Sequence, residues 1–253
     1  MARLGFLLLL LTAFGCTPSG AQHGALPPPA RRTFVLVHGA TGGSWDWRAM
    51  DSLMTPRGHR VVRPSLTGLG ERVHLASPDI GLATHIDDVV NAILWENLRD
   101  VVLVGHSYGG MVIAGVADRI PERIRRLVYM DAFLPDSGET GLELAESIGA
   151  TRLRQNARGG FIIPGGSDTS TIPRDVPHPL RTFTDTLRLA NSAARRLPGT
   201  YILTFERGKE PDSFQRFADR ARSRGWRVVR MEADHVPERS APVALMKVLE
   251  AVE

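Results

Sequence analysis

Short runs of aliphatic and β-branched residues alternate along the chain with segments whose apolar positions recur every three or four residues. The runs predict strands at 33–37, 60–63, 101–104, 127–130, 201–204 and 227–230. The recurring positions predict helices from a Thr84 N-cap to about residue 94 and at about 108–118, 213–223 and 242–252. This alternation is typical of a mostly parallel sheet with helices on both faces, because parallel neighbours need crossover connections. We therefore predict an α/β fold.

Residues 132–198 interrupt this alternation with a segment rich in Gly, Pro and Arg. We predict that they form a lid over the carboxyl edge of the sheet, inserted before the penultimate strand of a core made of 33–131 and 199–253. The apolar residues that could line a pocket beneath the lid are Phe133, Leu134, Leu142, Phe161, Ile162, Ile163, Phe183 and Leu187. A mostly apolar pocket suits an uncharged ligand.

The first residues are typical of an export signal. Arg3 precedes the apolar run Leu4–Phe14, which is shorter than the roughly 20 residues that span a bilayer. We predict a signal peptide at 1–21 and a linker at 22–32. The alternative is a lipoprotein leader that ends before Cys16, in which case an acylated Cys16 would be the protein's membrane contact. Either version predicts a periplasmic or secreted protein.

The composition limits the kinds of partner that we expect for the protein. The chain is 43% hydrophobic and 23% charged, close to the globular average. Its single cysteine can make neither an internal disulfide nor a zinc set. The net charge is +4, with arginines scattered among acids rather than gathered in a stripe, so we expect no nucleic-acid partner. No H-E-x-x-H motif occurs, and we expect no metal; the oligomeric state is left open.

A candidate nucleophile lies in Gly105-His106-Ser107-Tyr108-Gly109, which matches G-x-S-x-G between a predicted strand and a predicted helix. A sharp strand-to-helix turn would expose the Ser107 hydroxyl at the end of the sheet. The Tyr108 amide, at the start of the helix, is a candidate donor to a developing oxyanion.

A second oxyanion donor is expected from the loop after the first strand, His38-Gly39-Ala40-Thr41-Gly42-Gly43, and we assign it to the Ala40 amide. These glycines do not form a phosphate loop, because no Lys-Ser/Thr pair follows them. His38 is interpreted as a structural turn residue.

A serine nucleophile needs a base, and eight histidines are available. His235 is favoured because it follows the strand at 227–230 and precedes the last helix. His106 adjoins Ser107, but the geometry of the turn directs its side chain away. The remaining histidines, expected in the leader or as solvated or locally hydrogen-bonded residues, are His23, His59, His74, His85 and His178.

Three stretches resemble the hydroxynitrile lyase and methylsalicylate esterase group of the α/β-hydrolase superfamily: Leu36–Ala40 with Gly43-x-Trp45-x-Trp47, Leu66–Arg72, and Val104–Met111. Ala233-Asp234-His235 also fits, so the resemblance spans nearly the whole mature chain. It implies the α/β-hydrolase fold and cofactor-free hydrolysis of a small ester. It also implies that Trp45 and Trp47 pack the first helix against the sheet.

Two departures disfavour the lyase branch. Hydroxynitrile lyases of this group carry threonine after the first histidine and lysine after the catalytic one, whereas this chain has Gly39 and Val236. The lysine charge that would stabilise departing cyanide is therefore missing.

The acid that orients His235 has three candidates. The aspartate that the resemblance places after the strand at 201–204 falls in register on Arg207, and Glu206 and Asp212 lie nearby. Asp131, at the end of the preceding strand, is favoured, because the chain resembles α/β-hydrolases and some members of that superfamily carry their acid at this strand end. Glu206 is the first alternative and Asp212 the second.

These residues together predict a serine carboxylic ester hydrolase that forms an acyl-enzyme with small, largely apolar esters. The alternatives are a lactonase or an enzyme cleaving carbon–carbon or cyanohydrin bonds on the same triad. A non-catalytic receptor with this fold is a third, which the export signal disfavours.

Overall fold

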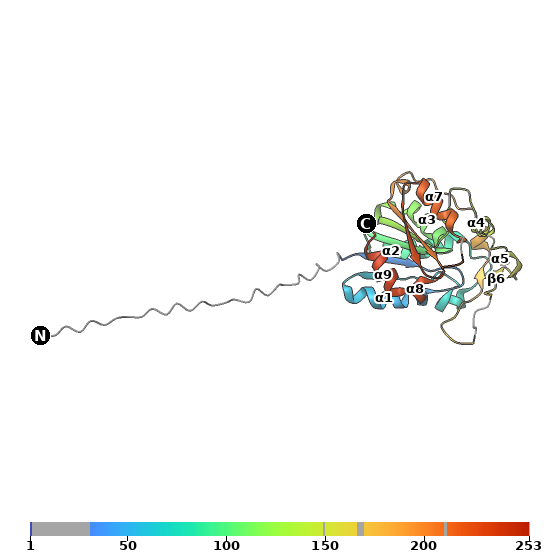
Figure 1. Ribbon diagram of the computed structural model, residues 1–253. Helices are drawn as coiled ribbons and strands as arrows, with labels where there is room; N and C mark the ends of the chain where they lie inside the picture. The colour runs from blue at the N-terminus through green and yellow to red at the C-terminus, as the bar shows by residue number, and fades with distance from the viewer. Residues whose placement is uncertain (2–30, 149, 166–169, 210–211, 253) are drawn as a thin grey trace.

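The computed structural model describes Met1 and residues 31–148, 150–165, 170–209 and 212–252, and its centre is a parallel sheet (Figure 1). Within these residues, six strands pair side by side in the order β2-β1-β3-β4-β8-β9. They are β2 (Arg60–Val62), β1 (Thr33–Val37), β3 (Val101–His106), β4 (Ile124–Met130), β8 (Gly199–Phe205) and β9 (Arg227–Glu232). Each predicted strand is present, although β4 begins at Ile124 rather than at 127.

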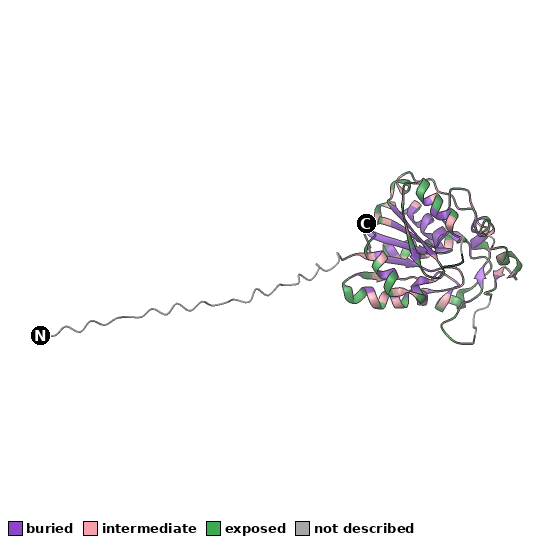
Figure 2. Ribbon diagram, in the orientation of Figure 1, coloured by how far each residue is buried: buried purple, intermediate pink, exposed green. Residues whose placement is uncertain are grey.

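Helices cover both faces of the sheet. One layer consists of α2 (Leu82–Trp95), α3 (Gly109–Arg119) and α7 (Gln215–Ser223), and the other of α1 (Arg48–Met54), α8 (Pro237–Ser240) and α9 (Pro242–Glu250) (Figure 1). Successive residues of β1 face opposite layers, since Val35 and Val37 belong to one hydrophobic cluster and Phe34 and Leu36 to the other. The strands are accordingly buried between the layers (Figure 2). The predicted α/β architecture is confirmed.

The prediction that Thr84 is the N-cap of this helix is wrong. Helix α2 begins at Leu82 after an N-cap at Gly81 that makes no side-chain hydrogen bond. The cap comes instead from a distant residue, because the Leu82 amide donates to Asp185 Oδ2 over 3.0 Å. A contact between segments so far apart in the chain leaves no local pattern in the sequence.

The residues between β4 and β8, called the insertion (132–198) below, contain short elements. These are α4 (Gly141–Glu146), α5 (Arg152–Gln155), an antiparallel sheet of β5 (Ala157–Arg158), β6 (Phe161–Ile162) and β7 (His178–Pro179), and α6 (Arg181–Thr184). Short 3-10 turns complete the chain: η1 (Ser44–Trp47), η2 (Thr55–Arg57), η3 (Gly70–Leu75), η4 (Pro121–Arg123) and η5 (Ala194–Arg196).

The insertion packs on the loops that follow β1 and β3. The ring of Phe183 stacks on Tyr108 with centroids 4.8 Å apart, and the Val176 amide donates to the Thr41 carbonyl over 2.8 Å. Phe133, Leu134, Phe183 and Leu187 belong to the buried core cluster, so these predicted pocket walls serve mainly to seat the insertion.

The two tryptophans near the first helix differ. Trp47 is fully buried against the sheet, as expected. Trp45 is only half-buried, and the guanidinium of Arg239 lies 4.8 Å from its ring centroid. Trp45 belongs to neither buried cluster of the described residues and is not among the residues packed against them, so its predicted role in packing the first helix against the sheet is wrong.

Apart from Met1, the predicted signal peptide and its Cys16 anchor lie outside the described residues, as does the linker up to residue 30. Among the residues that are described, none of the helices combines the length and apolarity needed to cross a membrane.

Candidate active site

Ser107 occupies the turn between β3 and α3. Its φ of 52° is in the left-handed region, which a residue with a side chain rarely adopts. Small neighbours permit this turn, since a Cβ on Gly105 would lie 2.8 Å from the Gly109 carbonyl oxygen. The Phe133 amide donates to the Ser107 carbonyl over 3.1 Å and ties the turn to the segment after β4.

Asp131 occupies a second strained turn, at the end of β4. Its φ is 44°, and the side chain is buried. The Tyr201 hydroxyl braces this turn by accepting from the Ala132 amide over 3.0 Å and donating to the Ala132 carbonyl over 2.8 Å. One carboxylate oxygen, Oδ1, accepts the Thr204 amide over 3.2 Å, which leaves Oδ2 to face the site.

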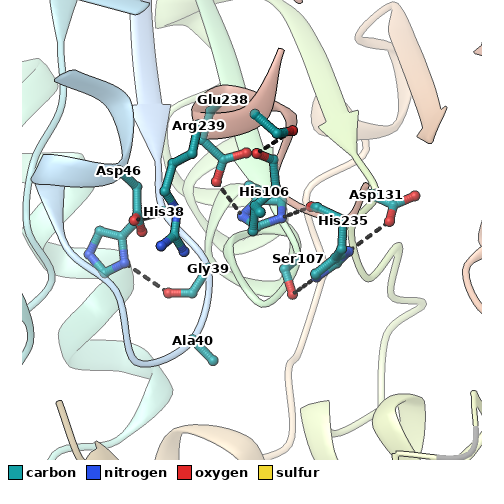
Figure 3. Close-up of polar contacts among 12 residues, drawn as sticks. His38, Gly39, Ala40, Asp46, His106, Ser107, Asp131, His235, Glu238 and Arg239 are labelled. Carbon is teal, nitrogen blue, oxygen red and sulfur yellow. Dashed lines mark hydrogen bonds and ion pairs between the residues drawn. The ribbon is translucent and has the colours of Figure 1, made fainter. Parts of the chain in front are cut away.

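His235 joins the two turns (Figure 3). Its Nδ1 lies 2.7 Å from Asp131 Oδ2, and its Nε2 lies 3.1 Å from Ser107 Oγ. In the neutral ring, Nδ1–H donates to the carboxylate and Nε2 accepts the serine proton. Phe214 stacks on the imidazole with centroids 4.8 Å apart. The ring is therefore held at both nitrogens and on one face.

The alternative acids have other partners. Glu206 pairs with Lys209 at the surface over 2.7 Å. Arg207, in the register where the resemblance expects an aspartate, is exposed and pairs with Glu232 over 2.8 Å. Asp212 accepts the Phe214 amide over 2.7 Å. Of these side chains and Asp131, the structure brings only Asp131 within hydrogen-bond distance of His235.

The two predicted oxyanion donors flank Ser107. Neither the Ala40 nor the Tyr108 amide donates a hydrogen bond to another described residue. His38 orients the first of them: its Nε2 accepts the Leu66 amide over 3.2 Å, so its Nδ1–H donates to the Gly39 carbonyl over 2.8 Å. Because a trans peptide directs its C=O and N–H in opposite directions, this bond aims the Ala40 N–H. Burial lowers the pKa of His38 to about 4, which keeps the ring neutral.

Hydrogen bonds of its side chain fix the position of Tyr108. The hydroxyl donates to His85 Nδ1 over 3.0 Å, while His85 Nε2–H donates to the Thr67 carbonyl over 3.0 Å. Burial lowers the pKa of His85 to about 4, so both bonds are made by a neutral ring. His59, His85 and His178 are buried, and the prediction that they are solvated or only locally bonded is wrong. Each is covered by a segment distant in sequence.

His106 lies behind His235. Its Nε2–H donates to the His235 carbonyl over 2.7 Å, and its Nδ1 lies 3.1 Å from Glu238 Oε1 without the alignment of a hydrogen bond. Burial raises the pKa of Glu238 well above its usual range and lowers that of His106. Burial thus favours the uncharged form of both groups, and the hydrogen bond from His106 steadies the backbone of His235.

A cavity of about 330 Å³ begins at Ala40, beside the nucleophile turn. Its lining is mixed, with apolar side chains and four polar ones: Ala40, Thr41, Ala150, Arg152, Leu153, Asn156, Ile162, Ile163, Pro164, Gly165 and Asp175. Ile162 and Ile163 are the two predicted pocket walls that line it. Among the described residues, His, Cys, Asp and Glu form no group of three or more that could hold a metal ion.

Comparison with known proteins places this geometry in a family. The model of the alpha/beta hydrolase family matches residues 34–248. The chain belongs to this family. The hydrolase is 38% identical over 223 residues to a carbendazim hydrolyzing esterase of Nocardioides sp. (strain SG-4G), a match covering 80% of this chain and 91% of that one. It is 32% identical over 144 residues to methylesterase 1 of Arabidopsis thaliana, covering 56% and 55% of the two chains.

A solved structure agrees with this fold. An extracellular alpha/beta-hydrolase from a Paenibacillus species superposes with a TM-score of 0.72 over 87% of the hydrolase and 98% of that chain, at 24% identity. The relatives that are named as esterases agree with the enzyme class that the sequence predicts.

Sequence reasoning missed the residues that support this hydrolase's site. No sequence motif marks Tyr201, whose hydroxyl braces the turn at Asp131, or Glu238, whose carboxyl lies beside His106. His85 and His178 were noted only as ordinary polar residues. Each of these side chains acts on the site through contacts that form only when distant segments pack.

Proposed function

We propose that this hydrolase cleaves small, uncharged carboxylic esters through an acyl-enzyme on Ser107. The observation that supports this most directly is the continuous contact from Ser107 Oγ to His235 Nε2 over 3.1 Å and from His235 Nδ1 to Asp131 Oδ2 over 2.7 Å. A serine hydroxyl is a weak nucleophile until an adjacent base accepts its proton. Here the base and the group that orients it are both in place.

The geometry supports a two-step reaction. Ser107 Oγ attacks the ester carbonyl as its proton passes to His235 Nε2, and the Ala40 and Tyr108 amides stabilise the oxyanion. Imidazolium returns the proton to the leaving alcohol, which departs. Water then attacks the acyl-enzyme with His235 as base and releases the acid and free Ser107. Asp131 keeps Nδ1 protonated and stabilises the imidazolium throughout.

The substrate class follows from the cavity beside Ala40 and from the esterase names of the relatives. Cyanohydrin cleavage is not favoured. A Cβ at Gly39 would lie 3.0 Å from His106 Nδ1 and 3.2 Å from Ser107 Cβ, so the threonine of the lyases does not fit without movement. A lactone is a cyclic ester that the same residues could open, and it belongs in the substrate panel.

A fluorophosphonate probe tests the proposal. We expect the wild-type protein to gain one adduct on Ser107 by mass spectrometry, and Ser107→Ala to gain none. We also expect the variant to lose about 10⁴-fold or more in turnover of a chromogenic acetate ester. Ser223→Ala, an exposed serine, is the control and keeps full activity. An unlabelled Ser107, or an active Ser107→Ala variant, contradicts the proposal and favours the receptor alternative or another mechanism.

We also propose that the protein is exported, on the strength of Arg3 and the apolar run Leu4–Phe14. Expression in a bacterial host followed by fractionation and intact mass tests this. A mass matching cleavage after Ala21 supports a signal peptide. A lipidated mass that disappears in Cys16→Ser supports the anchor instead. Full-length protein in the cytoplasm contradicts export.

A further inference from the structure

His178 is a fully buried histidine of the insertion whose bonds lead to the loop that carries Ala40. It comes from β7, far in sequence from Ser107, His235 and Asp131. We propose that His178 is a positioning residue that ties the two halves of the oxyanion hole to the insertion. This inference rests on the proposed esterase function, because it concerns the amides that would stabilise its oxyanion.

The hydrogen bonds of His178 define its tautomer. Its Nδ1 accepts the Thr41 amide over 3.2 Å, so Nε2 carries the proton and donates to Thr182 Oγ1 over 2.7 Å. The Thr182 hydroxyl then donates to the Pro179 carbonyl over 2.8 Å. These bonds hold the His178 ring at both nitrogens.

This relay acts on the Ala40 half of the hole. Thr41 has a φ of 63°, in the left-handed region, so its backbone needs outside support. The insertion supplies it from both sides, since His178 accepts the Thr41 amide and the Val176 amide donates to the Thr41 carbonyl over 2.8 Å. The Thr41 amide belongs to the peptide plane that follows Ala40. Holding that plane limits the rotation that would turn the Ala40 N–H away from the oxyanion.

The same ring contacts the Tyr108 half. The His178 and Tyr108 rings meet edge to face with centroids 4.8 Å apart, and Phe183 stacks on Tyr108 from the same insertion. His85 accepts the hydrogen bond of the Tyr108 hydroxyl, and the ring centroids of His85 and His178 lie 5.6 Å apart. His178 therefore contacts Tyr108, which carries one of the two amides. It also contacts Thr41, the residue after Ala40, which carries the other. Burial, with the nearby His85 and His38, lowers the pKa of His178, consistent with a neutral acceptor.

The test compares His178→Leu, which removes the acceptor, with His178→Asn, whose Oδ1 lies at the position of the lost Nδ1. Removing an oxyanion donor outright lowers kcat by about 10²–10³-fold, so a displaced one should lower it by about 10–100-fold. We expect this loss in His178→Leu with KM changed less than about threefold. His178→Asn should recover at least about a third of the wild-type kcat.

A boronic acid supplies a readout that general destabilisation does not reproduce. Its tetrahedral adduct on Ser107 places an oxygen in the oxyanion hole, so its inhibition constant should rise in proportion to the loss in kcat/KM. His59→Leu is the matched control. That histidine is also buried, and its Nδ1 accepts the Arg32 amide over 3.3 Å, away from the site. We expect His59→Leu to lower the melting temperature and leave kcat and boronate inhibition unchanged.

The outcomes separate the two proposals. A folded His178→Leu with kcat and boronate inhibition within about twofold of wild type overturns the inference, as does His178→Asn falling as far as the leucine variant. If His178→Leu does not fold, Thr182→Val, which removes the acceptor for Nε2–H, decides in the same way by its kcat at unchanged KM. Failure of the fluorophosphonate to label wild-type Ser107 refutes the esterase function itself.

Discussion

Among single residues, Asp131 shows most clearly how this site is built. The acid follows β4 instead of β8, yet it reaches His235 because parallel neighbours end at the same edge of the sheet. At the position after β8, Arg207 turns outward to Glu232. The cost of the left-handed backbone at Asp131 is offset by the hydroxyl of Tyr201 on β8, which braces the adjoining peptide.

We predict that Asp131→Asn lowers kcat by about 10³–10⁴-fold, because an amide cannot hold His235 in the productive tautomer or stabilise imidazolium. Glu206→Gln should stay within about twofold of wild type, since Glu206 pairs with Lys209 at the surface. Steady-state kinetics on one chromogenic ester measures both. If Glu206→Gln is the more damaging change, the role of acid passes to Glu206.

Among the elements, the insertion is integrated with the helices of the core. Its residue Asp185 caps α2 by accepting the Leu82 amide, and its Phe183 stacks on Tyr108 before α3. The insertion therefore stabilises the same helix layer that supports the nucleophile turn.

We predict that Asp185→Ala lowers the free energy of unfolding by about 1 kcal/mol, the usual cost of losing an N-cap acceptor. Thr84→Ala should change it by less than about 0.5 kcal/mol, since Thr84 lies inside the first turn of α2 and caps nothing. Urea denaturation of both variants measures the difference. A larger loss in Thr84→Ala would restore the cap that the sequence predicts.

For the molecule as a whole, four buried histidines determine how stability varies with pH. Burial lowers the pKa of His38 and His85 to about 4 from an ordinary 6.5, and it lowers the pKa of His106 and His178 well below that value. Below pH 6.5 the unfolded chain therefore binds protons that the folded protein does not. Each such histidine removes about 1.4 kcal/mol of stability per pH unit until its folded pKa is reached.

Two buried carboxyls act in the opposite direction. Burial raises the pKa of Asp46 to about 6 and that of Glu238 well above its usual range, so the folded protein retains protons that the unfolded chain releases. Acidification through this range stabilises the fold through these two groups. The histidines outnumber them, and the net effect of acid is a loss of stability.

We predict that the free energy of unfolding is about 2 kcal/mol lower at pH 5.5 than at pH 7.5. Glu238→Gln removes one of the opposing carboxyls and should make this loss larger. Denaturant titrations at the two pH values measure both effects. An equal or higher stability of the wild-type protein at pH 5.5 would show that the buried histidines are charged in the folded state.

The α/β fold and the candidate residues Ser107 and His235 could be predicted from local signals. The apolar run before Gly105, the small residues around Ser107 and the position of His235 after β9 act through sterics and chain order, which the sequence carries directly. The sequence left the acid open among Asp131, Glu206 and Asp212, because register along one chain does not say which strand end faces an imidazole.

The other features of the site and the fold depend on tertiary packing. Asp185 rather than Thr84 caps α2, Trp45 lies outside the core, and His178 and His85 are buried supports rather than solvated residues. Each of these depends on a hydrogen bond or a ring contact between segments far apart in the chain. Such contacts are specific in three dimensions but leave no periodicity or motif in one, so local sequence signals could name the reacting groups but not the side chains that hold them in place.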